Sequence, residues 1–474
     1  MNTLNSLQEE ILLVQNKIGR LKNLTAQIQN NRSMRISELL VRLPSLRNSK
    51  GRSDFKTWIK GGQSSPEYQP LCQLHNELAV LEQKLQAKLD VLENRKKNPA
   101  PYLCLFLGTI DFEFLFQRPQ HIAVRLAESG LPVFYISSDF GAVDKTKQGV
   151  YLRYPPDSIA RCIQMCMDED SQEKVTTWLL DMVQEASRLS QCQKFVLINQ
   201  HPLWQNAAQA VRQQYPDSII VVDYMDDYLD FPGADPDLKP FVRQMLKESD
   251  LVIATSLYLE EKARQGGAKE VQLIRNGTES THFTSAYRAQ PTANKPVVGY
   301  YGVLSDWFDT SKIEALSRSD LDIEIRLIGH IGMDTNKRFE KLRASPKVTI
   351  MDAVPYNKLP QELKDFDVCL IPFKADSDLI KATNPVKFYE YLSAGKPVVS
   401  TQIPELMPFR NQFVLCENED EAFVEAVRSC LQNTSGLSEP EECIAFASEN
   451  DWNTRAKQVK RAIETALQTD VIQP

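Results

Sequence analysis

The feature that most constrains this chain is an alternation of short apolar runs with longer amphipathic stretches, which begins at Tyr102. Short apolar runs bounded by turn residues are typical of strands buried on both faces, and the amphipathic stretches between them are typical of covering helices. YLCLFLG (102–108), a helix-like stretch over 119–129 and PVFYIS follow one another in this way. The alternation predicts βαβ units, and hence a parallel sheet with helices on both faces.

The alternation occurs twice along the chain. The further runs lie at 194–199, 218–224, 250–256 and 270–277, and then at 296–302, 323–329, 347–352, 367–373 and 396–401. Residues 278–296 are polar, contain proline and show no periodicity, so we expect an interdomain linker there. A length of 474 residues suits two large domains and an accessory segment. We predict an α/β protein with two Rossmann-like, doubly wound domains at 99–285 and 286–450, and a C-terminal helix within 451–474 that packs back on the first domain.

Residues 1–98 have a different pattern, which predicts an α-helical coiled-coil arm. Apolar residues recur at steps of three and four over 1–28, and leucines do so again over 71–92, before prolines end the pattern. The two helices could pair as an antiparallel hairpin within one chain, or between chains as a homo-oligomer. The sequence leaves this choice open.

The charge distribution limits the partners. The net charge of −7 argues against a general nucleic-acid binder. Residues 29–70 nevertheless carry eight Lys or Arg against three Asp or Glu, a local charge of +5. This segment is either a solvated linker or a peripheral contact with an anionic membrane surface. With neither a signal-like start nor an apolar run of about 18 residues, we expect a cytoplasmic protein, peripheral at the inner face of the membrane if the basic segment makes that contact.

The nine cysteines are scattered through apolar segments, and their spacing does not complete a zinc site. We interpret them as reduced core residues and predict no metal site.

The segment KATNPVKFYEYLSAGKPVVS (381–400) is the most informative for chemistry. Asn384 suits an N-cap and Pro385 the first helical position, so a helix is expected to begin here with free amides that can hold a phosphate. Lys387 in the first turn suits a diphosphate, and Glu390 on the same face suits a ribose diol. The alternative is that Lys387 and Glu390 form an exposed i,i+3 ion pair.

NPVKFYEYLSAGKPVV resembles the donor-site segment of GT-B glycosyltransferases, which use nucleotide sugars and consist of two Rossmann-like domains. Further stretches agree in order: FLFQRPQHIAVRLAESGLPVFYIS, VDYMDDYLDFPG, SDLVIATSLYLEEKA, IRNGTESTHF and VVGYYGVLSDWFD. The resemblance covers about residues 100–465 and is closest to bacterial polysaccharide-type members that resemble family 4. The arm lies outside it.

The resemblance implies which residues bind the donor. Beside Glu390, which would bind the ribose, they are Gly302, Asp306, Gly329, His330, Tyr356, Asn384, Pro385 and Lys387. Retaining members of family 4 usually have a glutamate eight residues before the equivalent of Glu390, where this chain has Ala382. The anomeric outcome is therefore left open.

The first domain is expected to bind the acceptor, through Arg118, Gln120 and His121 at the entrance to a helix. Arg118 would contact a phosphate of a lipid-linked acceptor or of the donor, or else be a capping or surface arginine. If the enzyme inverts, a general base is needed, and Asp111, His201 and Asp226 are candidates. The sequence does not choose among them, and each aspartate could instead stabilise a turn.

These patterns predict transfer of a sugar from a nucleotide-diphosphate donor to a glycan or lipid-linked acceptor, in bacterial polysaccharide or glycoconjugate synthesis. Neither a cofactor nor a metal is expected, because helix dipoles and basic side chains can stabilise the leaving diphosphate. One alternative is a sugar-nucleotide epimerase on the same fold. Another is an inactive GT-B scaffold that acts through its coiled coil, which Ala382 would favour.

Overall fold

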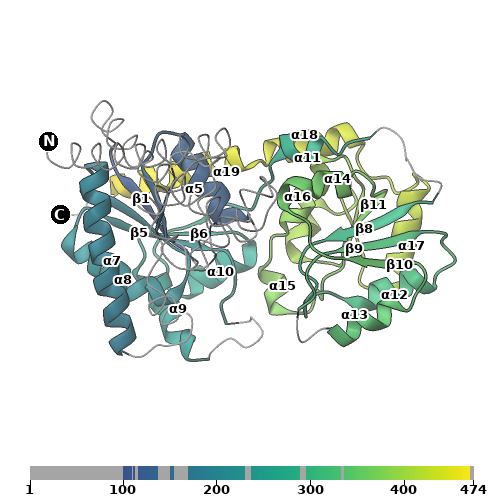
Figure 1. Cartoon of the computed structure of the whole chain (residues 1–474), viewed down its shortest axis with the longest axis horizontal. Coiled ribbons are helices and arrows are strands. Elements are labelled where there is room, and N and C mark those ends of the chain that lie inside the picture. The colour runs from purple at the N-terminus through teal and green to yellow at the C-terminus, as the bar shows by residue number, and fades with distance from the viewer. Residues whose placement is uncertain are drawn as a thin grey trace, which may run out of the picture.

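The computed structural model describes residues 100–108, 110, 112, 116–136, 150–153, 169–229, 236–288, 295–332 and 336–469. The predicted coiled-coil arm, with its basic segment, lies outside these residues. The described chain forms two α/β domains, each built on a parallel sheet (Figure 1). The predicted α/β class with two doubly wound domains is confirmed.

The first sheet has the strand order β3-β2-β1-β4-β5-β6-β7, with every pair parallel. Its strands are β1 (Leu103–Leu107), β2 (Val133–Ile136), β3 (Val150–Arg153), β4 (Phe195–Asn199), β5 (Ile219–Tyr224), β6 (Leu251–Ala254) and β7 (Val271–Leu273). The order reverses direction between β1 and β4, and ligands of open parallel sheets bind beyond the carboxyl ends of strands at such a point.

Strand β1 shows why the apolar runs are unbroken. Leu103 and Leu105 lie in one hydrophobic core, whereas Cys104 and Phe106 lie in another on the opposite face of the sheet. The first core is covered by α7 (Glu169–Ser190) and α8 (Gln205–Gln214), and the second by α5 (Arg118–Glu128) and α19 (Trp452–Thr469). Because side chains alternate between two buried faces, every position of the strand is apolar. Helices α9 (Lys239–Glu248) and α10 (Leu257–Gln265) cover β5 and β6.

The second sheet repeats the design with the order β10-β9-β8-β11-β12-β13. Its strands are β8 (Val297–Tyr301), β9 (Glu324–Ile328), β10 (Val348–Met351), β11 (Val368–Ile371), β12 (Val398–Ser400) and β13 (Leu415–Cys416). The helices of this domain are α12 (Thr310–Arg318), α13 (Asn336–Arg343), α14 (Leu359–Leu363), α15 (Asp378–Ala382), α16 (Val386–Ser393), α17 (Asp420–Leu431) and α18 (Pro440–Glu449).

The connection between the domains differs from the expected linker. Helix α11 (Ser280–Thr284) forms where an irregular linker from residue 278 was predicted, and it packs on α16 and α18. Phe283 is fully buried in the core of the second domain and anchors this helix. The prediction was wrong for this stretch because a five-residue helix is too short to show a periodicity.

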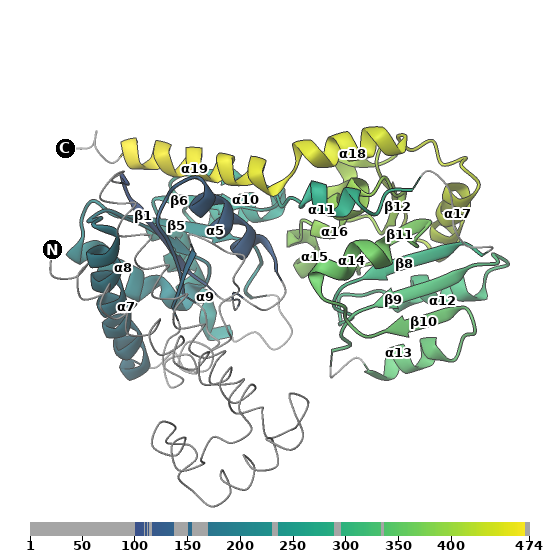
Figure 2. The same ribbon diagram turned by 45° about the horizontal axis from the view of Figure 1, so that its top comes forward.

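The chain crosses between the domains a second time, at the junction of α18 and α19. The two helices follow one another across both domains (Figure 2). The two crossings touch, since Trp452 N donates to Thr278 O at 3.0 Å. Helix α19 then packs on α5, with Trp452 and Ile463 in the first domain's core. Within the described residues, we find no helix that is long and apolar enough to cross a membrane.

Candidate functional site

The predicted donor segment forms α16, but its N-terminus differs from the expectation. Pro385 is the N-cap, and no side chain caps the helix. The prediction of an Asn384 N-cap was wrong because its side chain is held elsewhere. Asn384 Oδ1 accepts a hydrogen bond from Asn276 N at 2.9 Å, and its Nδ2 donates to Tyr389 Oη at 3.3 Å. The start of α16 is thus free of a side-chain cap.

Lys387 extends from the first turn of α16 to the end of β8. Its Nζ lies over the ring of Tyr300, 5.5 Å from the centroid. A Cβ at Gly302, whose φ is +133°, would lie 2.3 Å from Lys387 Cε and 2.6 Å from Nζ. Glycine at 302 therefore makes room for the ammonium group. Burial lowers the pKa of Lys387, although the carboxylate of Glu390 opposes that shift.

Gly329 allows a second close approach at the same edge of the sheet. A Cβ there would lie 1.8 Å from Gly302 O, so any larger residue would push apart the turns that follow β8 and β9. The two glycines let these backbones pack against each other below the Lys387 amine. This geometry suits a binding group that must approach the backbone closely.

Glu390 is 6% exposed, so the alternative of an exposed Lys387–Glu390 ion pair is wrong. Its Oε2 accepts a hydrogen bond from Tyr301 Oη at 2.8 Å. Burial raises the pKa of Glu390 to about 7, against the lowering effects of Lys387 and of the Tyr301 hydroxyl. Near neutral pH the carboxyl group is therefore divided between its protonated and ionised forms.

The remaining predicted donor residues lie in different environments. Asp306 pairs with Arg338 Nη1 at 3.3 Å, while His330 is exposed and its backbone O accepts Leu304 N. Tyr356 lies in an aromatic cluster between the domains: its ring stacks on His282, with centroids 5.1 Å apart, and lies 5.8 Å from that of His121. Tyr356 thus touches the first domain.

Arg118, the first residue of α5, is buried and ion-paired. Its Nε donates to Asp223 Oδ1 at 2.9 Å, and its Nη1 donates to Ile274 O and Arg275 O. The alternative of a surface arginine is wrong, because the side chain is only 3% exposed. Its guanidinium binds Asp223 and the carbonyls of residues 274 and 275, so in these contacts it does not cap a helix. The guanidinium joins α5, the end of β5 and the segment that leaves the first domain.

The other two predicted acceptor residues are also buried. Gln120 Oε1 accepts Gln117 N at 3.1 Å and so caps the start of α5. His121 stacks on Trp452 of α19, with ring centroids 4.9 Å apart at an interplanar angle of 13°. Both side chains thus contribute to the structure around the start of α5, and their predicted contact with an acceptor stays a prediction.

Among the three candidate bases, Asp111 lies outside the described residues. His201 Nδ1 accepts Leu203 N at 3.3 Å, and burial lowers the pKa of His201 to about 4. Asp226 follows β5 and is half-buried. Burial, followed by the charges of Asp223 and Asp227, raises the pKa of Asp226 to about 6.

The two acidic neighbours of Asp226 are both ion-paired. Asp223 is paired with Arg118, and Asp227 is paired with Lys262 of α10. Within the part of the chain that the structure describes, these side chains do not form a cluster that could hold a metal ion.

Comparison with known proteins identifies the second domain. Residues 296–433 match the family model described as "Glycosyl transferases group 1". We call the matched second domain the group 1 domain, after the family that it resembles. The matched range contains Gly302, Lys387 and Glu390.

A protein of Bacillus subtilis strain 168, the putative teichuronic acid biosynthesis glycosyltransferase TuaH, is 22% identical over 229 residues. The match covers 46% of this chain and 57% of that protein. This chain therefore spans little more than half the length of the relative that it matches.

Two solved structures show the same fold. Anabaena HepE, in complex with UDP and glucose, has a TM-score of 0.56 at 16% identity and covers 76% of this chain and 99% of its own. Sucrose-phosphate synthase from Thermosynechococcus elongatus has a TM-score of 0.58 at 15% identity, and the match covers 78% of this chain and 100% of that one. The two-domain architecture that carries the group 1 domain is therefore GT-B.

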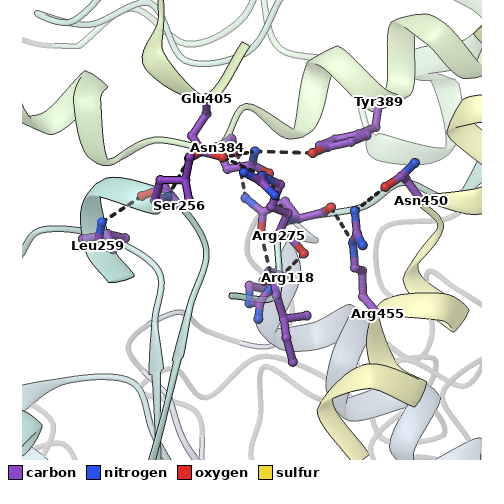
Figure 3. Close-up of polar contacts among 12 residues, drawn as sticks. Arg118, Ser256, Leu259, Arg275, Asn384, Tyr389, Glu405, Asn450 and Arg455 are labelled. Atoms are coloured by element: carbon purple, nitrogen blue, oxygen red, sulfur yellow. Dashed lines mark hydrogen bonds and ion pairs between the residues drawn. The ribbon is translucent and has the colours of Figure 1, made fainter. Parts of the chain in front are cut away.

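Sequence reasoning missed a polar network that joins the group 1 domain to the first domain (Figure 3). Glu405 accepts hydrogen bonds from Arg275 Nε at 2.7 Å and from Leu257 N at 2.6 Å. Arg455 of α19 donates from its Nε to Asn276 O at 2.9 Å and from Nη2 to Asn450 Oδ1 at 2.5 Å. No spacing in the sequence relates 275 to 405 or 455, so only the fold could reveal these pairs.

Two further features of the group 1 domain bear on the site. Sequence reasoning also missed Tyr301, whose hydroxyl binds Glu390. Its position next to Gly302, at the carboxyl end of β8, could have indicated a residue of the site. Ala382 is 1% exposed and packs in the core formed by α9, α10 and β5–β6 of the first domain. A glutamate at this position would be buried among apolar groups, which explains in physical terms why the chain has a small side chain there.

Proposed function

We propose that this chain is a glycosyltransferase that moves a sugar from a nucleotide-diphosphate donor to a glycan or lipid-linked acceptor. The observation that carries the proposal is the arrangement at the start of α16. There, an uncapped helix N-terminus, the Lys387 amine against Gly302 and the buried Glu390 carboxyl lie within one turn. The group 1 model covers all of these residues, which supports the proposal.

In this proposal Lys387 and the first amides of α16 bind the diphosphate. The helix N-terminus and the ammonium group are both positive, so they stabilise negative charge that develops on the leaving diphosphate as the glycosidic bond breaks. Gly302 makes room for the Lys387 amine, and Gly329 lets the turns that follow β8 and β9 lie close together. These groups need no metal or cofactor to perform this role.

Glu390 would accept hydrogen bonds from the ribose hydroxyls. Its Oε2 already accepts the Tyr301 hydroxyl, which orients the carboxyl group and leaves Oε1 for the ligand. HepE has been solved with UDP, so UDP is the first nucleotide to test. The likeness to TuaH supports an acceptor in polysaccharide synthesis.

On the acceptor side we propose Asp226 as the general base if the reaction inverts. A general base works best with a pKa near the operating pH, and the pKa of Asp226 is raised to about 6. His201 suits the role less well, because its Nδ1 is occupied by Leu203 N and its pKa is lowered to about 4.

The test is the affinity for UDP, measured by calorimetry on the whole chain and on the separate variants Lys387→Gln and Glu390→Gln. We expect Kd to rise at least about tenfold in each, which corresponds to about 1.4 kcal/mol. Lys341→Gln and Glu417→Gln are matched controls in the same domain: Lys341 is exposed, and Glu417 is half-buried and paired with Arg410. Unchanged affinity in both site variants would overturn the assignment.

A second measurement separates transfer from its alternatives. Product formation from a UDP-sugar without acceptor, with inversion at a ring carbon, would indicate an epimerase. Nucleotide binding without turnover on any glycan or lipid-linked acceptor would favour the inactive scaffold. Release of UDP that depends on an acceptor is the outcome expected of a glycosyltransferase.

A further inference from the structure

Glu405 lies where the two domains meet, yet the proposed chemistry does not use it. It belongs to the 3₁₀ segment Pro404–Phe409 of the second domain, and only 1% of its side chain is exposed. Its Oε1 accepts Leu257 N, the first amide of α10 in the first domain. Its Oε2 accepts Arg275 Nε in the segment that leaves that domain. One buried carboxylate thus binds two groups across the junction.

The same carboxylate is connected to the start of α16. Asn384 Nδ2 lies 3.4 Å from Glu405 Oε2, and Figure 3 shows the two side chains beside Arg275. Asn384 exchanges two hydrogen bonds with Asn276: its Oδ1 accepts Asn276 N at 2.9 Å, and its backbone O accepts Asn276 Nδ2 at 2.7 Å. Asn384 precedes the N-cap of α16, so the contacts that join the domains also fix the chain where the proposed donor helix begins.

We propose that Glu405 is a positioning residue that holds the two domains in the orientation required for transfer and acts through Asn384 on α16. This inference rests on the proposed function, because the transfer in question is the proposed glycosyl transfer. Asn384, expected from the sequence to contact the diphosphate or sugar, instead has its side chain bonded to Asn276, Tyr389 and Glu405 and acts in this linkage.

The charges around Glu405 explain why it can perform this role. Arg118 and Arg455 both donate hydrogen bonds to the segment 274–276, which contains Arg275. Arg118 is paired with Asp223, and Arg275 is paired with Glu405. Glu405 also lies at the positive N-terminal end of α10, where a carboxylate is favourable. Separation of the domains would break the contacts of this carboxylate with the Leu257 amide and the Arg275 guanidinium. The contact therefore favours the orientation seen here over a separated one.

The linkage should also work in the opposite direction. Because the start of α16 and the domain contact share Asn384, a ligand that binds the start of α16 more tightly in this orientation also stabilises the contact between the domains. Nucleotide binding and domain orientation would then be coupled, although the nucleotide does not touch Glu405.

The test uses the full chain with Glu405→Gln, which keeps the size and one acceptor oxygen but removes the charge. Glu417→Gln is the control, because Glu417 pairs with Arg410 within the second domain at 2.9 Å. Small-angle scattering reports domain orientation without reference to activity. We expect a larger radius of gyration for Glu405→Gln and an unchanged value for the control.

Kinetics supply the second readout. For Glu405→Gln we expect kcat for transfer to fall at least about tenfold and Kd for UDP to rise by a smaller factor, about threefold. Lys387 and Glu390 are intact in this variant, so only the part of the binding free energy that is coupled to domain orientation is lost. Arg275→Gln should give the same changes, and the double variant should be no worse than either single one. Asn384→Ala, which keeps the Glu405–Arg275 pair, should lower kcat with a smaller change in scattering.

The proposal fails if Glu405→Gln and Arg275→Gln both keep the scattering curve and kcat of the unaltered chain. It also fails if their effects add independently in the double variant. If the unaltered chain shows no transfer, the proposed function fails, but the scattering comparison still decides whether Glu405 sets the domain orientation. Should Glu405→Gln not fold, Arg275→Lys, which keeps the charge but changes the geometry, provides the same comparison.

Discussion

At the scale of single residues, the pKa values at the proposed site depend on burial. Glu390 and Lys387 lie three positions apart in α16 with opposite charges, yet burial raises the pKa of the acid and lowers that of the base. Each shift disfavours the charged form. A bound nucleotide would reverse this balance, because phosphate favours the ammonium group and ribose hydroxyls favour the carboxylate.

Donor affinity should therefore depend on pH. The Glu390 carboxyl must lose its proton to accept two ribose hydroxyls, and its pKa in the free protein is about 7. We expect Kd for UDP-glucose, whose diphosphate does not titrate in this range, to be constant above about pH 8 and to rise towards tenfold per pH unit below about pH 7. Calorimetry between about pH 5.5 and 8.5 measures it, and Glu390→Gln should give a flat profile. A flat profile for the unaltered chain would contradict the assignment.

At the scale of secondary-structure elements, two close approaches support the proposed site: the contact of β8 with α16 and the attachment of α5 to β5. In each contact, one residue at the end of a strand or helix determines how closely the other element can approach. Gly302 does this for the Lys387 side chain, and Arg118 does it through Asp223 and the carbonyls of residues 274 and 275.

Gly302→Ala should weaken nucleotide binding while the fold is retained. The new methyl group would lie where Lys387 Cε and Nζ now are, so the flexible lysine must move away from the start of α16. We expect Kd for UDP to rise at least about tenfold, or about 1.4 kcal/mol, by calorimetry. Gly436→Ala is the matched control, with a φ of +69° and no atom within 4 Å of the added Cβ. Equal affinity in the two variants would show that Lys387 does not need its present position.

Asp223→Ala should destabilise the first domain strongly. It leaves Arg118 buried without its carboxylate, and removal of one partner from a buried ion pair costs about 3–5 kcal/mol. Glu128→Ala removes the exposed partner of Arg125 on the same helix and should cost less than about 1 kcal/mol. Urea unfolding of the two variants compares these costs. Similar unfolding midpoints would mean that the Arg118–Asp223 pair contributes little to stability.

Much of the sheet architecture could be predicted from the sequence, and the site only in part. The apolar runs predicted most strands within two residues at each end, because burial on both faces leaves a strong local signal. Strands β3 and β13 were not predicted, because VYLR of β3 is not an unbroken apolar run and β13 has only two residues. Lys387 and Glu390 lie three apart on one helix and could be recognised together. The Glu405–Arg275 pair is separated by 130 residues, and no local pattern relates its members.

At the scale of the whole molecule, two connections and a polar network join the domains, and the arm lies outside the described residues. The α16 region contacts the first domain through Asn384 and Ala382, whereas the crossings contact each other through Thr278 and Trp452. Whether the arm contributes to the proposed chemistry is tested by deleting it.

Deletion of residues 1–98 should leave the affinity for UDP unchanged and lower the molar mass of the particle in solution by more than the mass of the deleted segment. Sedimentation measures the mass, and co-flotation with anionic liposomes measures membrane contact in the same samples. If the number of chains per particle and the flotation are both unaffected, the heptad pattern pairs within one chain and the basic segment is a solvated linker. A loss of UDP affinity would show instead that the arm supports the two domains.

The return of α19 to the first domain affects the order in which the protein can assemble during synthesis. Part of that domain's core, including Trp452 and Ile463, is made only after the whole second domain has been translated. About 180 residues separate the end of β7 from the start of α19, which at ~5–20 residues per second is a delay of roughly 10–35 s. During that interval one face of the first sheet is covered by α5 but lacks α19. The first domain should therefore become fully protease-resistant only after the second domain has left the ribosome.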